Sequence, residues 1–535
     1  MPKVASPLHS PALVGGISFG MPEFLESLLL GDPGRDLLTD PARSLNAAEV
    51  VTRTGRLAAW LSKEGVGPGD VVAIFSRNRV EYYEAIMASS LLGISYIPVN
   101  WHWAHGELAY VLGDASPRAL FVDPSLAGVA STAIREAGYA GRVVALAGEG
   151  SDPSWLPYEE VVSAGDLPEL GDPVQFGMPM FYTSGTTGRP KGVRGTVTAS
   201  PVALSQFVAA YSGGLGMPRQ GRTLLDGPVY HSAQWLFSAL PLLSGSSVHI
   251  QGRFDAEATL AAIERHRITN IHMVPTQFVR ILKLPKETIA SYDLSSIQVI
   301  WHGGAPCPPA VKDGILEVFG DHVVEYYGST ELGVNTMISP QEWRNKRGSV
   351  GKALPNVDLR IFGEDGGELP QGESGIVAAR GQRSFHYHNE PAKTEGARIG
   401  DGFSTVGDIG YLDEEGYLFI SDRKIDMIIS GGVNIYPAEI EAVIHTHPRV
   451  LDTAVIGVPD DEFGESVLAL VSVTPGEVDE AGLEGEVIDL CREQLAHYKA
   501  PRQVKVVEEI PRSLAGKILK SQLRAPYWEG LSRRI

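Results

Sequence analysis

The residues best suited to chemistry lie in one run, residues 181–193. Within it, 183–187 supplies four hydroxyl groups and a glycine, and Lys191 stands between Pro190 and Gly192. Hydroxyl and backbone N–H groups donate hydrogen bonds to phosphate oxygens, and glycine lets the backbone approach a ligand closely. A lysine adds a point charge suited to polyphosphate. The pattern predicts a phosphate-binding loop, and the short apolar segment before it predicts a strand that leads into the loop.

This loop differs from the Walker A loop, because no G-x-x-x-x-G-K-[ST] string occurs in the chain. A run of Ser, Thr and Gly by itself is more typical of a polar surface loop. The ending Pro190-Lys191-Gly192 favours the phosphate-binding interpretation.

Three strings further along could bind the rest of a nucleotide. The segment 301–306 (Trp-His-Gly-Gly-Ala-Pro) follows the apolar run 297–300, and its glycines allow close approach to a flat ligand, although alone it is typical of an ordinary strand-to-helix turn. In 327–331 (Tyr-Gly-Ser-Thr-Glu), the tyrosine offers a stacking face, the threonine a hydroxyl for phosphate and the glutamate a hard oxygen for Mg²⁺. Asp408, in the string 407–411, offers a carboxylate that can bind both ribose hydroxyls.

Two further positions carry candidate catalytic side chains. His231 follows a short apolar run, although a lone histidine is more often a satisfied buried side chain than a catalyst. Lys517 lies in a basic segment near the C-terminus, where a lysine is normally solvated, and Lys520 is the nearby alternative.

In this order, the strings resemble the motifs of the adenylate-forming superfamily of acyl- and aryl-CoA synthetases, luciferases and peptide-synthetase adenylation domains. The chain is most like the fatty acyl-CoA synthetases, and the resemblance covers nearly its whole length. It implies that the loop holds the β- and γ-phosphates of ATP and that Lys517 contacts the reacting carboxylate and the α-phosphate. The implied nucleotide-binding residues are Thr183, Ser184, Gly185, Thr186, Thr187, Gly188, Lys191, Gly303, Gly304, Ala305, Pro306, Tyr327, Gly328, Ser329, Thr330, Asp408, Arg423 and Lys517.

The resemblance also implies the other parts of the site. The catalytic residues would be Lys517, His231, Thr330 and Glu331, and Glu331 would also be the metal ligand. The acyl pocket would comprise His231, Ser232, Gln234, Trp235, His302 and Gly303, and the channel for the pantetheine arm of CoA would pass Gly431 and Gly432.

Three positions distinguish this chain from parts of the superfamily. Amino-acid-activating relatives carry an aspartate where this chain has His231, so an amino-acid substrate is not expected. Val406 stands where relatives often have threonine, which leaves the neighbouring carboxylate in place. Ile425 stands where relatives have a charged hinge pivot, so the pivot residue is left open.

Strands alternate with helices along the chain, which predicts an α/β fold with parallel sheets covered by helices on both faces. The clearest helix is 46–64, with Asn46 as N-cap and Glu49 three residues later. Other expected elements are a helix at 80–91 and strands at 71–75, 96–99, 119–122, 143–146, 297–300, 323–326, 417–420 and 427–429, with a charged break at 421–426.

At 535 residues the chain is expected to hold at least two domains. The resemblance implies a large N-terminal domain (1–421) of helix-covered sheets with a small barrel-like subdomain. It further implies a hinge at 422–426 and a small mobile α+β C-terminal domain (427–535).

Composition narrows the function. The 45 basic and 64 acidic residues give a net charge of −19, which argues against nonspecific nucleic-acid binding. Cys307 and Cys491 form neither a metal motif nor a disulfide framework. No signal-peptide layout occurs and no apolar run reaches the roughly 18 residues of a membrane span, so we expect a cytoplasmic enzyme without integral membrane contact.

The expected reaction uses Mg²⁺ as cofactor and ATP and CoA as co-substrates. A carboxylic acid, a medium- or long-chain fatty acid, is activated to acyl-AMP with release of pyrophosphate and then transferred to CoA. The alternatives are an aryl or sterol side-chain acid, and a carrier protein instead of CoA as acceptor. A luciferase-type oxygenase would share the first half-reaction. The oligomeric state is open, and a homodimer is one option.

Overall fold

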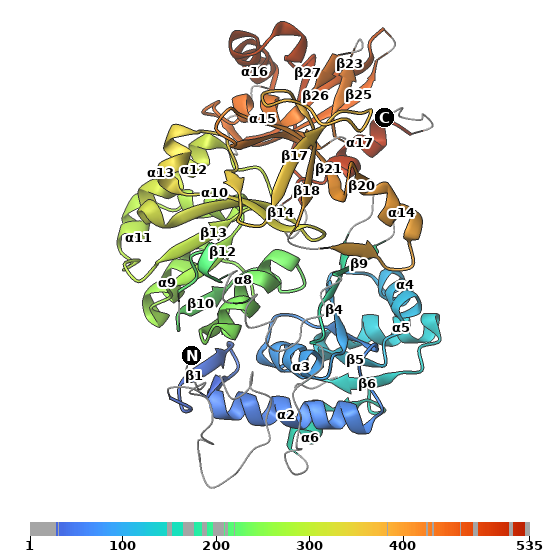
Figure 1. The fold of residues 1–535 in the computed structure, drawn as a ribbon. Coiled ribbons are helices and arrows are strands. Elements are labelled where there is room, and N and C mark those ends of the chain that lie inside the picture. The colour runs from blue at the N-terminus through green and yellow to red at the C-terminus, as the bar shows by residue number, and fades with distance from the viewer. Residues whose placement is uncertain are drawn as a thin grey trace, which may run out of the picture. The chain divides into compact units, whose positions relative to one another are not determined.

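The computed structural model describes residues 28–29, 32–146, 152–163, 176–183, 190–195, 208, 212–218, 220–381, 384–423, 426–430, 433–460, 462–473, 480–512 and 517–529 (Figure 1). The chain divides into two compact units. The first contains residues 1–179 and 198–208, and the second contains 180–197 and 209–535.

The first unit is built on a parallel sheet with the order β4-β3-β5-β6-β7. Its strands are β1 (Asp36–Thr39), β2 (Ser44–Asn46), β3 (Val71–Phe75), β4 (Ser95–Val99), β5 (Ala119–Val122), β6 (Arg142–Ala145) and β7 (Leu156–Pro157), and its helices are α2 (Ala47–Lys63), α3 (Val80–Leu91), α4 (His105–Ala115), η1 (Pro124–Leu126), α5 (Ala127–Ala137) and α6 (Tyr158–Ser163). β1 and β2 form an antiparallel pair. The capping box expected at the start of the first long helix is confirmed, since Asn46 and Glu49 exchange hydrogen bonds.

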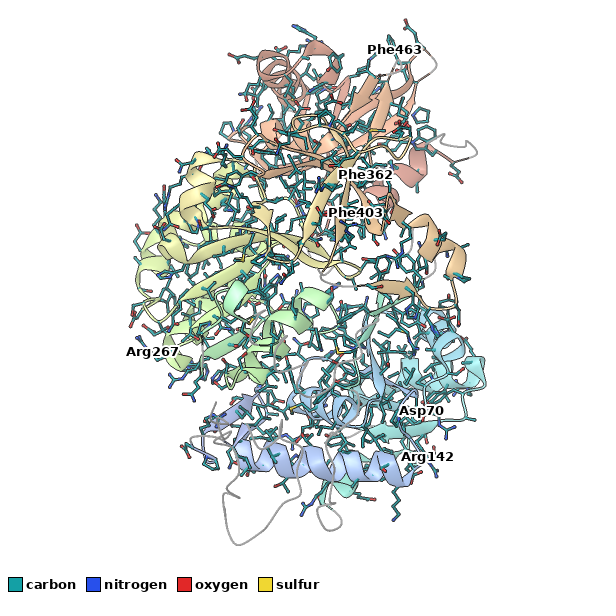
Figure 2. The ribbon with its side chains drawn as sticks, in the orientation of Figure 1. Asp70, Arg142, Arg267, Phe362, Phe403 and Phe463 are labelled. Carbon is teal, nitrogen blue, oxygen red and sulfur yellow. The ribbon has the colours of Figure 1, made fainter. Side chains whose placement is uncertain are left out.

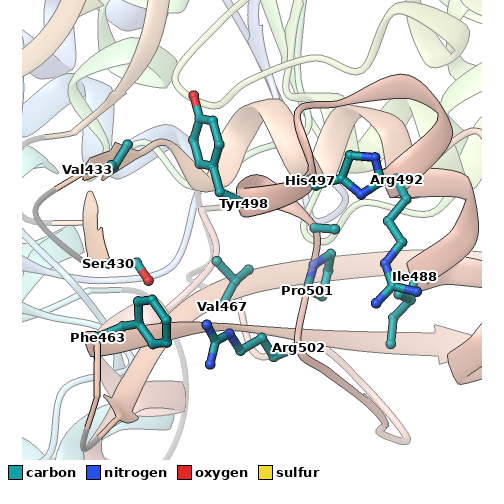
Figure 3. Close-up of a pocket in the computed structure, with 11 residues that line it drawn as sticks. Ser430, Val433, Phe463, Val467, Ile488, Arg492, His497, Tyr498, Pro501 and Arg502 are labelled. Carbon is teal, nitrogen blue, oxygen red and sulfur yellow. The ribbon is translucent and has the colours of Figure 1, made fainter.

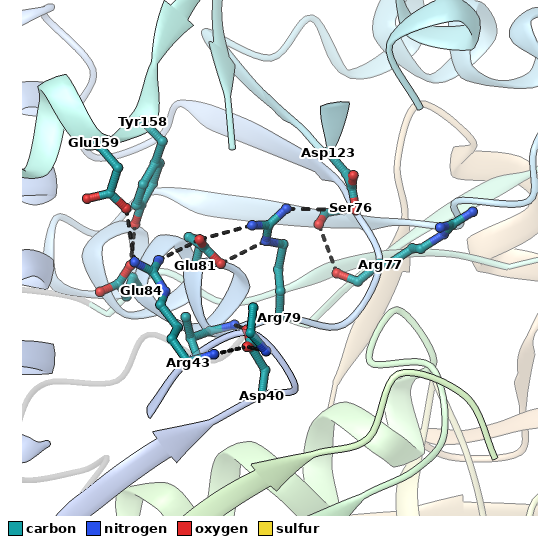
Figure 4. Close-up of polar contacts among 12 residues, drawn as sticks. Asp40, Arg43, Ser76, Arg77, Arg79, Glu81, Glu84, Asp123, Tyr158 and Glu159 are labelled. Carbon is teal, nitrogen blue, oxygen red and sulfur yellow. Dashed lines mark hydrogen bonds and ion pairs between the residues drawn. The ribbon is translucent and has the colours of Figure 1, made fainter. Parts of the chain in front are cut away.

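Buried ion pairs join the helices of this unit (Figure 4). Arg43 and Arg79 both bind the carboxylate of Glu81, at 2.5 and 2.7 Å. The fully buried carboxylate of Glu84 accepts hydrogen bonds from Arg53 at 2.5 Å and from the Tyr158 hydroxyl at 2.9 Å. Burial raises the pKa of Glu84 above its usual range, against the hydrogen bonds from Arg53. The carboxylate therefore depends on its arginine partner.

The second unit contains a mixed sheet in which β11, β10, β12, β13 and β14 run parallel and β15 and β16 antiparallel. Its strands are β10 (Arg222–Leu225), β11 (Ser247–Ile250), β12 (Asn270–Met273), β13 (Val299–His302), β14 (Val323–Ser329), β15 (Gly333–Ile338) and β16 (Lys352–Ala353), and its helices are α8 (Ser232–Leu243), α9 (Ala256–His266), α10 (Pro275–Leu282), α11 (Lys286–Ala290), α12 (Pro309–Phe319), η2 (Gly320–His322) and α13 (Pro340–Asn345).

Alternate residues of β12, β13 and β14 face opposite sides of this sheet. Ile271, Ile300 and Val323 pack in a core with residues of α9, α10 and α12. Their neighbours His272 and Trp301 stack on Phe237 of α8. Helices therefore cover both faces of this sheet, as expected.

Two antiparallel sheets follow in the same unit. One has the order β19-β9-β8, and the other β17-β18-β21-β20 with β22 on β21. Their elements are β8 (Met180–Thr183), β9 (Lys191–Gly195), β17 (Asp358–Phe362), β18 (Gly375–Arg380), β19 (Phe385–Tyr387), β20 (Arg398–Ile399), β21 (Phe403–Leu412), β22 (Leu418–Arg423) and α14 (Pro391–Gly396). Phe362 and Phe403 pack edge to face in the larger sheet, at 5.3 Å between ring centroids (Figure 2).

Residues 427–529 form an α+β region with the sheet order β24-β23-β26-β25 and β27 parallel to β26. Its elements are β23 (Ile428–Ser430), β24 (Val433–Ile435), α15 (Pro437–Ile444), β25 (Val450–Asp460), β26 (Gly464–Val473), α16 (Glu480–Gln494), η3 (His497–Lys499), β27 (Gln503–Val506), α17 (Lys520–Arg524) and η4 (Ala525–Tyr527). The large region of sheets and helices together with this smaller α+β region confirms the expected fold class.

Two expected boundaries were wrong. The strand expected at 297–300 lies at Val299–His302, because its last two residues pair with His272 and Met273 of β12. The charged break expected from Ser421 begins later, because β22 continues to Arg423, which pairs with Asp408 of β21. The hinge at 422–426 stays a prediction.

Candidate functional site

The expected phosphate-binding loop joins two paired strands. β8 ends at Thr183 and β9 begins at Lys191, and these two residues pair across the hairpin. Ser184, Gly185, Thr186, Thr187 and Gly188 lie outside the described residues. Partial burial lowers the pKa of Lys191, as does the nearby cation Lys393, whereas the carboxylates of Glu390 and Glu331 raise it.

Tyr387 joins Lys191 to Glu331. It lies on β19, which pairs with β9. The Nζ atom of Lys191 lies 5.5 Å from the centre of the Tyr387 ring, and the Tyr387 hydroxyl donates to Oε1 of Glu331 at 3.1 Å. Tyr387 could not be predicted from the sequence as a site residue, because this contact depends on pairing between β19 and β9, which lie almost 200 residues apart in the chain.

A tight turn presents Thr330 and Glu331. It joins β14 to β15, where Ser329 pairs with Gly333. Gly333 has a φ of +74°, and a Cβ on Gly328 would lie 2.2 Å from the Gly333 carbonyl oxygen, so both positions need glycine.

The same turn reaches the first residue of α8. The hydroxyls of Thr330 and Ser232 are 2.8 Å apart, so the two expected site residues share a hydrogen bond. Ser329 supports the turn, since its Oγ accepts from the Leu332 N–H at 3.0 Å.

Tyr327 and Asp408, both expected to bind the nucleotide, lie side by side. The Tyr327 hydroxyl donates to Oδ2 of Asp408 at 2.7 Å. Asp408 is buried and pairs through its backbone with Arg423, whose side chain lies outside the described part of the structure. Gly407 precedes it with a φ of +82°.

The segment 301–306 divides between the two faces of the sheet. His302 is fully buried on the side of Phe278 and of the Lys312–Glu325 ion pair. Burial and the nearby Lys312 hold the pKa of His302 well below its usual range, so this imidazole is neutral. Because it faces away from α8, the structure does not bring His302 together with Gln234.

Gly303 is required for packing. A Cβ on Gly303 would lie 2.8 Å from the Tyr326 ring and 2.6 Å from the Tyr326 carbonyl oxygen. Gly304 has a φ of +77° and is exposed, Ala305 is half-buried, and Pro306 is exposed ahead of α12.

The expected acyl-pocket residues at the start of α8 each contact a different part of the structure. His231 is the N-cap residue of α8, and its ring lies 4.5 Å from that of Tyr230. Trp235 packs edge to face on Phe181 at 5.8 Å. Gln234 turns toward the sheet, where its Nε2 lies 3.0 Å from Nδ1 of His272.

The two C-terminal lysines lie in opposite environments. Lys517 is exposed. Lys520 is buried on α17, and its Nζ lies 3.0 Å from Oε1 of Glu441. Arg512 binds both oxygens of Asp452, at 2.7 and 3.0 Å, and pairs through its backbone with Ile518, which fixes the chain beside Lys517.

A cleft of about 530 Å³ opens in the C-terminal region (Figure 3). Its lining residues include Ser430 and Val433, which flank Gly431 and Gly432 in the chain, although the two glycines lie outside the described residues. Basic and aromatic side chains also line it, namely Phe463, Arg492, His497, Tyr498 and Arg502. The guanidinium of Arg502 lies 4.1 Å from the centre of the Phe463 ring.

The carboxylate of Glu331 fits the expected metal. In the part of the chain that the structure describes, no cluster of three or more His, Cys, Asp or Glu side chains could hold an ion. A single carboxylate such as that of Glu331 is compatible with Mg²⁺, because this ion keeps several waters and binds one or two carboxylates together with substrate phosphates. Oε1 of Glu331 is held by Tyr387, which orients the carboxylate.

Comparison with known proteins identifies the family. The model of AMP-binding enzymes matches residues 29–386, and that of the AMP-binding enzyme C-terminal domain matches residues 439–517. The chain belongs to the AMP-binding enzyme family. This result confirms the expected adenylate-forming superfamily.

Relatives cover nearly the whole chain. The indoleacetate–CoA ligase of Aromatoleum aromaticum is 34% identical over 507 residues, which are 92% of this chain and 95% of the relative. The long-chain-fatty-acid–CoA ligase of Mycobacterium tuberculosis is 33% identical over 484 residues, 90% of this chain and 92% of the relative. The solved amide bond synthetase of Marinactinospora thermotolerans matches with a TM-score of 0.82 and 28% identity, over 94% of this chain and 99% of that one.

These relatives confirm an AMP-forming acid–thiol ligase of the acyl- or aryl-CoA ligase type. They leave the acid untested, because both fatty and aryl acids occur among the relatives' names. Among the described helices, none has both the length and the apolar character needed to cross a bilayer.

Proposed function

We propose that this enzyme joins a carboxylic acid to CoA in two steps at the site around Glu331. In the first step, a carboxylate oxygen of the acid attacks the α-phosphorus of ATP, and the bond to the β-phosphate oxygen breaks to release pyrophosphate. In the second, the CoA thiol attacks the acyl-AMP carbonyl, loses its proton to solvent and expels AMP. The observation that carries this proposal is that a chain of direct side-chain contacts links Lys191 through Tyr387 to Glu331, and that its neighbour Thr330 shares a hydrogen bond with Ser232.

In this proposal, each side chain has one task. Lys191, together with the loop that begins at Thr183, binds the departing pyrophosphate. Tyr327 and Asp408, already hydrogen-bonded to each other, bind the nucleoside. Glu331 would hold Mg²⁺, which would neutralise charge on the phosphate oxygens.

Lys517 supplies positive charge where the carboxylate meets the α-phosphate. Two anions must be aligned there, and charge spreads over the transferring centre, so a fixed cation lowers the barrier. Lys517 is exposed, whereas Lys520 is buried and paired with Glu441. We propose that the C-terminal domain turns about the hinge at 422–426 between the two steps.

The cleft in the C-terminal region supports CoA as the acceptor. Arg492, Arg502 and His497 can bind phosphate groups, and Phe463 and Tyr498 can stack on a base. The volume lies within the usual range for ligand pockets, and Ser430 and Val433 line the cleft. A phosphopantetheine arm on a carrier protein has no nucleotide, so it would not need these side chains.

The test of the whole reaction is pyrophosphate release across a panel of carboxylic acids, with and without CoA. We expect acid-dependent release of pyrophosphate, and formation of AMP and a thioester when CoA is present. The proposal would be refuted if none of the acids in the panel caused release of pyrophosphate.

The test of the acceptor compares CoA with pantetheine, which lacks the nucleotide. We expect Arg502→Ala to raise the KM for CoA about 10-fold, as the loss of a charged hydrogen bond does, and to leave the KM for pantetheine unchanged. Arg449→Ala is the matched control, because Arg449 pairs with Glu486 and does not line the cleft. An equal effect on both thiols would contradict nucleotide binding in this cleft.

A further inference from the structure

Three buried side chains form a hydrogen-bonded row beneath the first turn of α8. Nε2 of Gln234 lies 3.0 Å from Nδ1 of His272, and Nε2 of His272 lies 2.9 Å from the Tyr326 hydroxyl. Gln234, His272 and Tyr326 are 5, 2 and 6% exposed. An amide nitrogen can only donate, so Nδ1 of His272 accepts and its Nε2 carries the proton given to Tyr326.

His272 stays neutral in this row. Burial, with a smaller contribution from the nearby His231, lowers the pKa of His272 to about 3. Neutral His272 offers one acceptor and one donor, and the row uses both. The three side chains therefore have a single arrangement that satisfies them all.

The Tyr326 ring is fixed on its other sides as well. Phe237 packs against it at 5.0 Å between ring centroids and also stacks on His272 and Trp301. Gly303 lies so close that a Cβ there would be 2.8 Å from the ring. Tyr326 cannot turn aside without breaking its hydrogen bond and these contacts.

The row lies next to the proposed acyl site. Gln234 is itself one of the expected acyl-pocket residues and lies three residues after His231 at the start of α8, so the row borders the proposed acyl site. Ser232, between them, contacts Thr330 of the Glu331 turn. The acid's body would therefore meet the row directly behind its carboxylate.

We propose that Gln234, His272 and Tyr326 form the closed end of the acyl pocket and restrict the acid to compact aromatic acids. Resting on the proposed function, this inference names the substrate class of the same site. Aryl rings pack well against Tyr326 and Phe237, whereas a long alkyl chain would have to displace Tyr326. That displacement would leave the buried N–H of His272 without an acceptor.

The experiment measures kcat/KM for pyrophosphate release with phenylacetate and with decanoate. We expect the native enzyme to favour phenylacetate by at least about 10-fold, the range that one misfitting group produces in a pocket. Tyr326→Ala should shift the ratio toward decanoate by about 10- to 100-fold. Tyr326→Phe keeps the ring and loses only the hydroxyl, so it should shift the ratio in the same direction by a few-fold.

Tyr292→Phe is the control, because Tyr292 bonds Glu257 at the surface and should leave the ratio unchanged. Native preference for decanoate, or an unchanged ratio in the Tyr326 variants, would overturn the inference while leaving the proposed ligase reaction intact. If Tyr326→Ala fails to fold, the native ratio and Tyr326→Phe decide the question. Absence of pyrophosphate release with any acid would instead refute the proposed function, and this inference with it.

Discussion

Lys517 and Lys520 are three residues apart but have different surroundings. Substituting each of them should therefore separate an effect on the adenylation rate from an effect on the stability of the fold. Replacing the exposed Lys517 by alanine is expected to change the free energy of unfolding by less than about 0.5 kcal/mol, as surface substitutions usually do. If the Lys517 ammonium stabilises the developing charge, its removal should raise the adenylation barrier by about 3 to 4 kcal/mol, which slows adenylation roughly 10²- to 10³-fold.

Lys520→Ala should behave in the opposite way. Lys520 and Glu441 are both about nine-tenths buried, and Oε1 of Glu441 also accepts from the Val455 N–H at 2.7 Å. Removing the lysine leaves a buried carboxylate without its cation, which typically costs about 3 to 5 kcal/mol of stability. At temperatures where the variant remains folded, adenylation should proceed at a near-native rate.

Two assays on the same preparations decide the matter. Acid-dependent exchange of pyrophosphate into ATP reports adenylation, and denaturant unfolding reports stability. Thioester formation from supplied acyl-AMP isolates the second step, which Lys517→Ala should leave largely intact. Loss of both half-reactions to the same degree in Lys517→Ala would refute the division of labour, and so would loss of exchange in a stable Lys520→Ala enzyme.

Three further perturbations test other parts of the structure. Lys191→Ala should weaken ATP and pyrophosphate binding, seen as a raised KM for ATP, by more than it slows thioester formation from acyl-AMP; crippled thioester formation would contradict its role with the leaving group. Burial raises the pKa of Asp226 to about 7, so the folded state holds a proton that the unfolded chain releases above about pH 4, and stability from this group falls as pH rises toward 7. Unfolding measured against Asp226→Asn should show the native protein losing about 2.5 kcal/mol relative to the variant between pH 5 and 7.5, and a constant difference would show that the carboxyl is ionised throughout. Arg53→Met should cost about 3 to 5 kcal/mol because Glu84 is fully buried, whereas the exposed Arg142→Met should cost less than about 1 kcal/mol; equal midpoints in denaturant would argue against the buried network.

Local signals in the sequence were sufficient for much of the fold. The helix at Ala47–Lys63 follows from its apolar spacing and from the capping pair Asn46 and Glu49, all within one short segment. The strand before the phosphate-binding loop also agrees with its apolar run. Such features depend on neighbours in the chain, so one sequence can predict them.

Contacts between distant segments could not be predicted from local signals in the sequence. Tyr387 meets Glu331 only because β19 pairs with β9, and no residue near Tyr387 in the chain marks it as part of a site. The charged segment 421–426 resembles a turn in sequence, but pairing with β21 keeps the chain extended as far as Arg423. Tertiary pairing overrides local preference in both cases.

The alternation of side chains along three strands explains how one sheet separates the tasks of the site. In β14, Glu325 faces α12 and pairs with Lys312, whereas the next residue, Tyr326, faces α8 and ends the hydrogen-bonded row. The following residue, Tyr327, reaches Asp408, near the end of the strand. Glu325 and Tyr326 thus serve the core and the proposed acid because each step along a strand reverses the side chain's direction. Tyr327 serves the proposed nucleotide because it lies nearer the end of the strand, beside Asp408. Neighbouring residues of one sequence motif therefore lie in different environments. A shift of this strand by one residue would move Glu325 to the proposed acyl pocket and Tyr326 to the core.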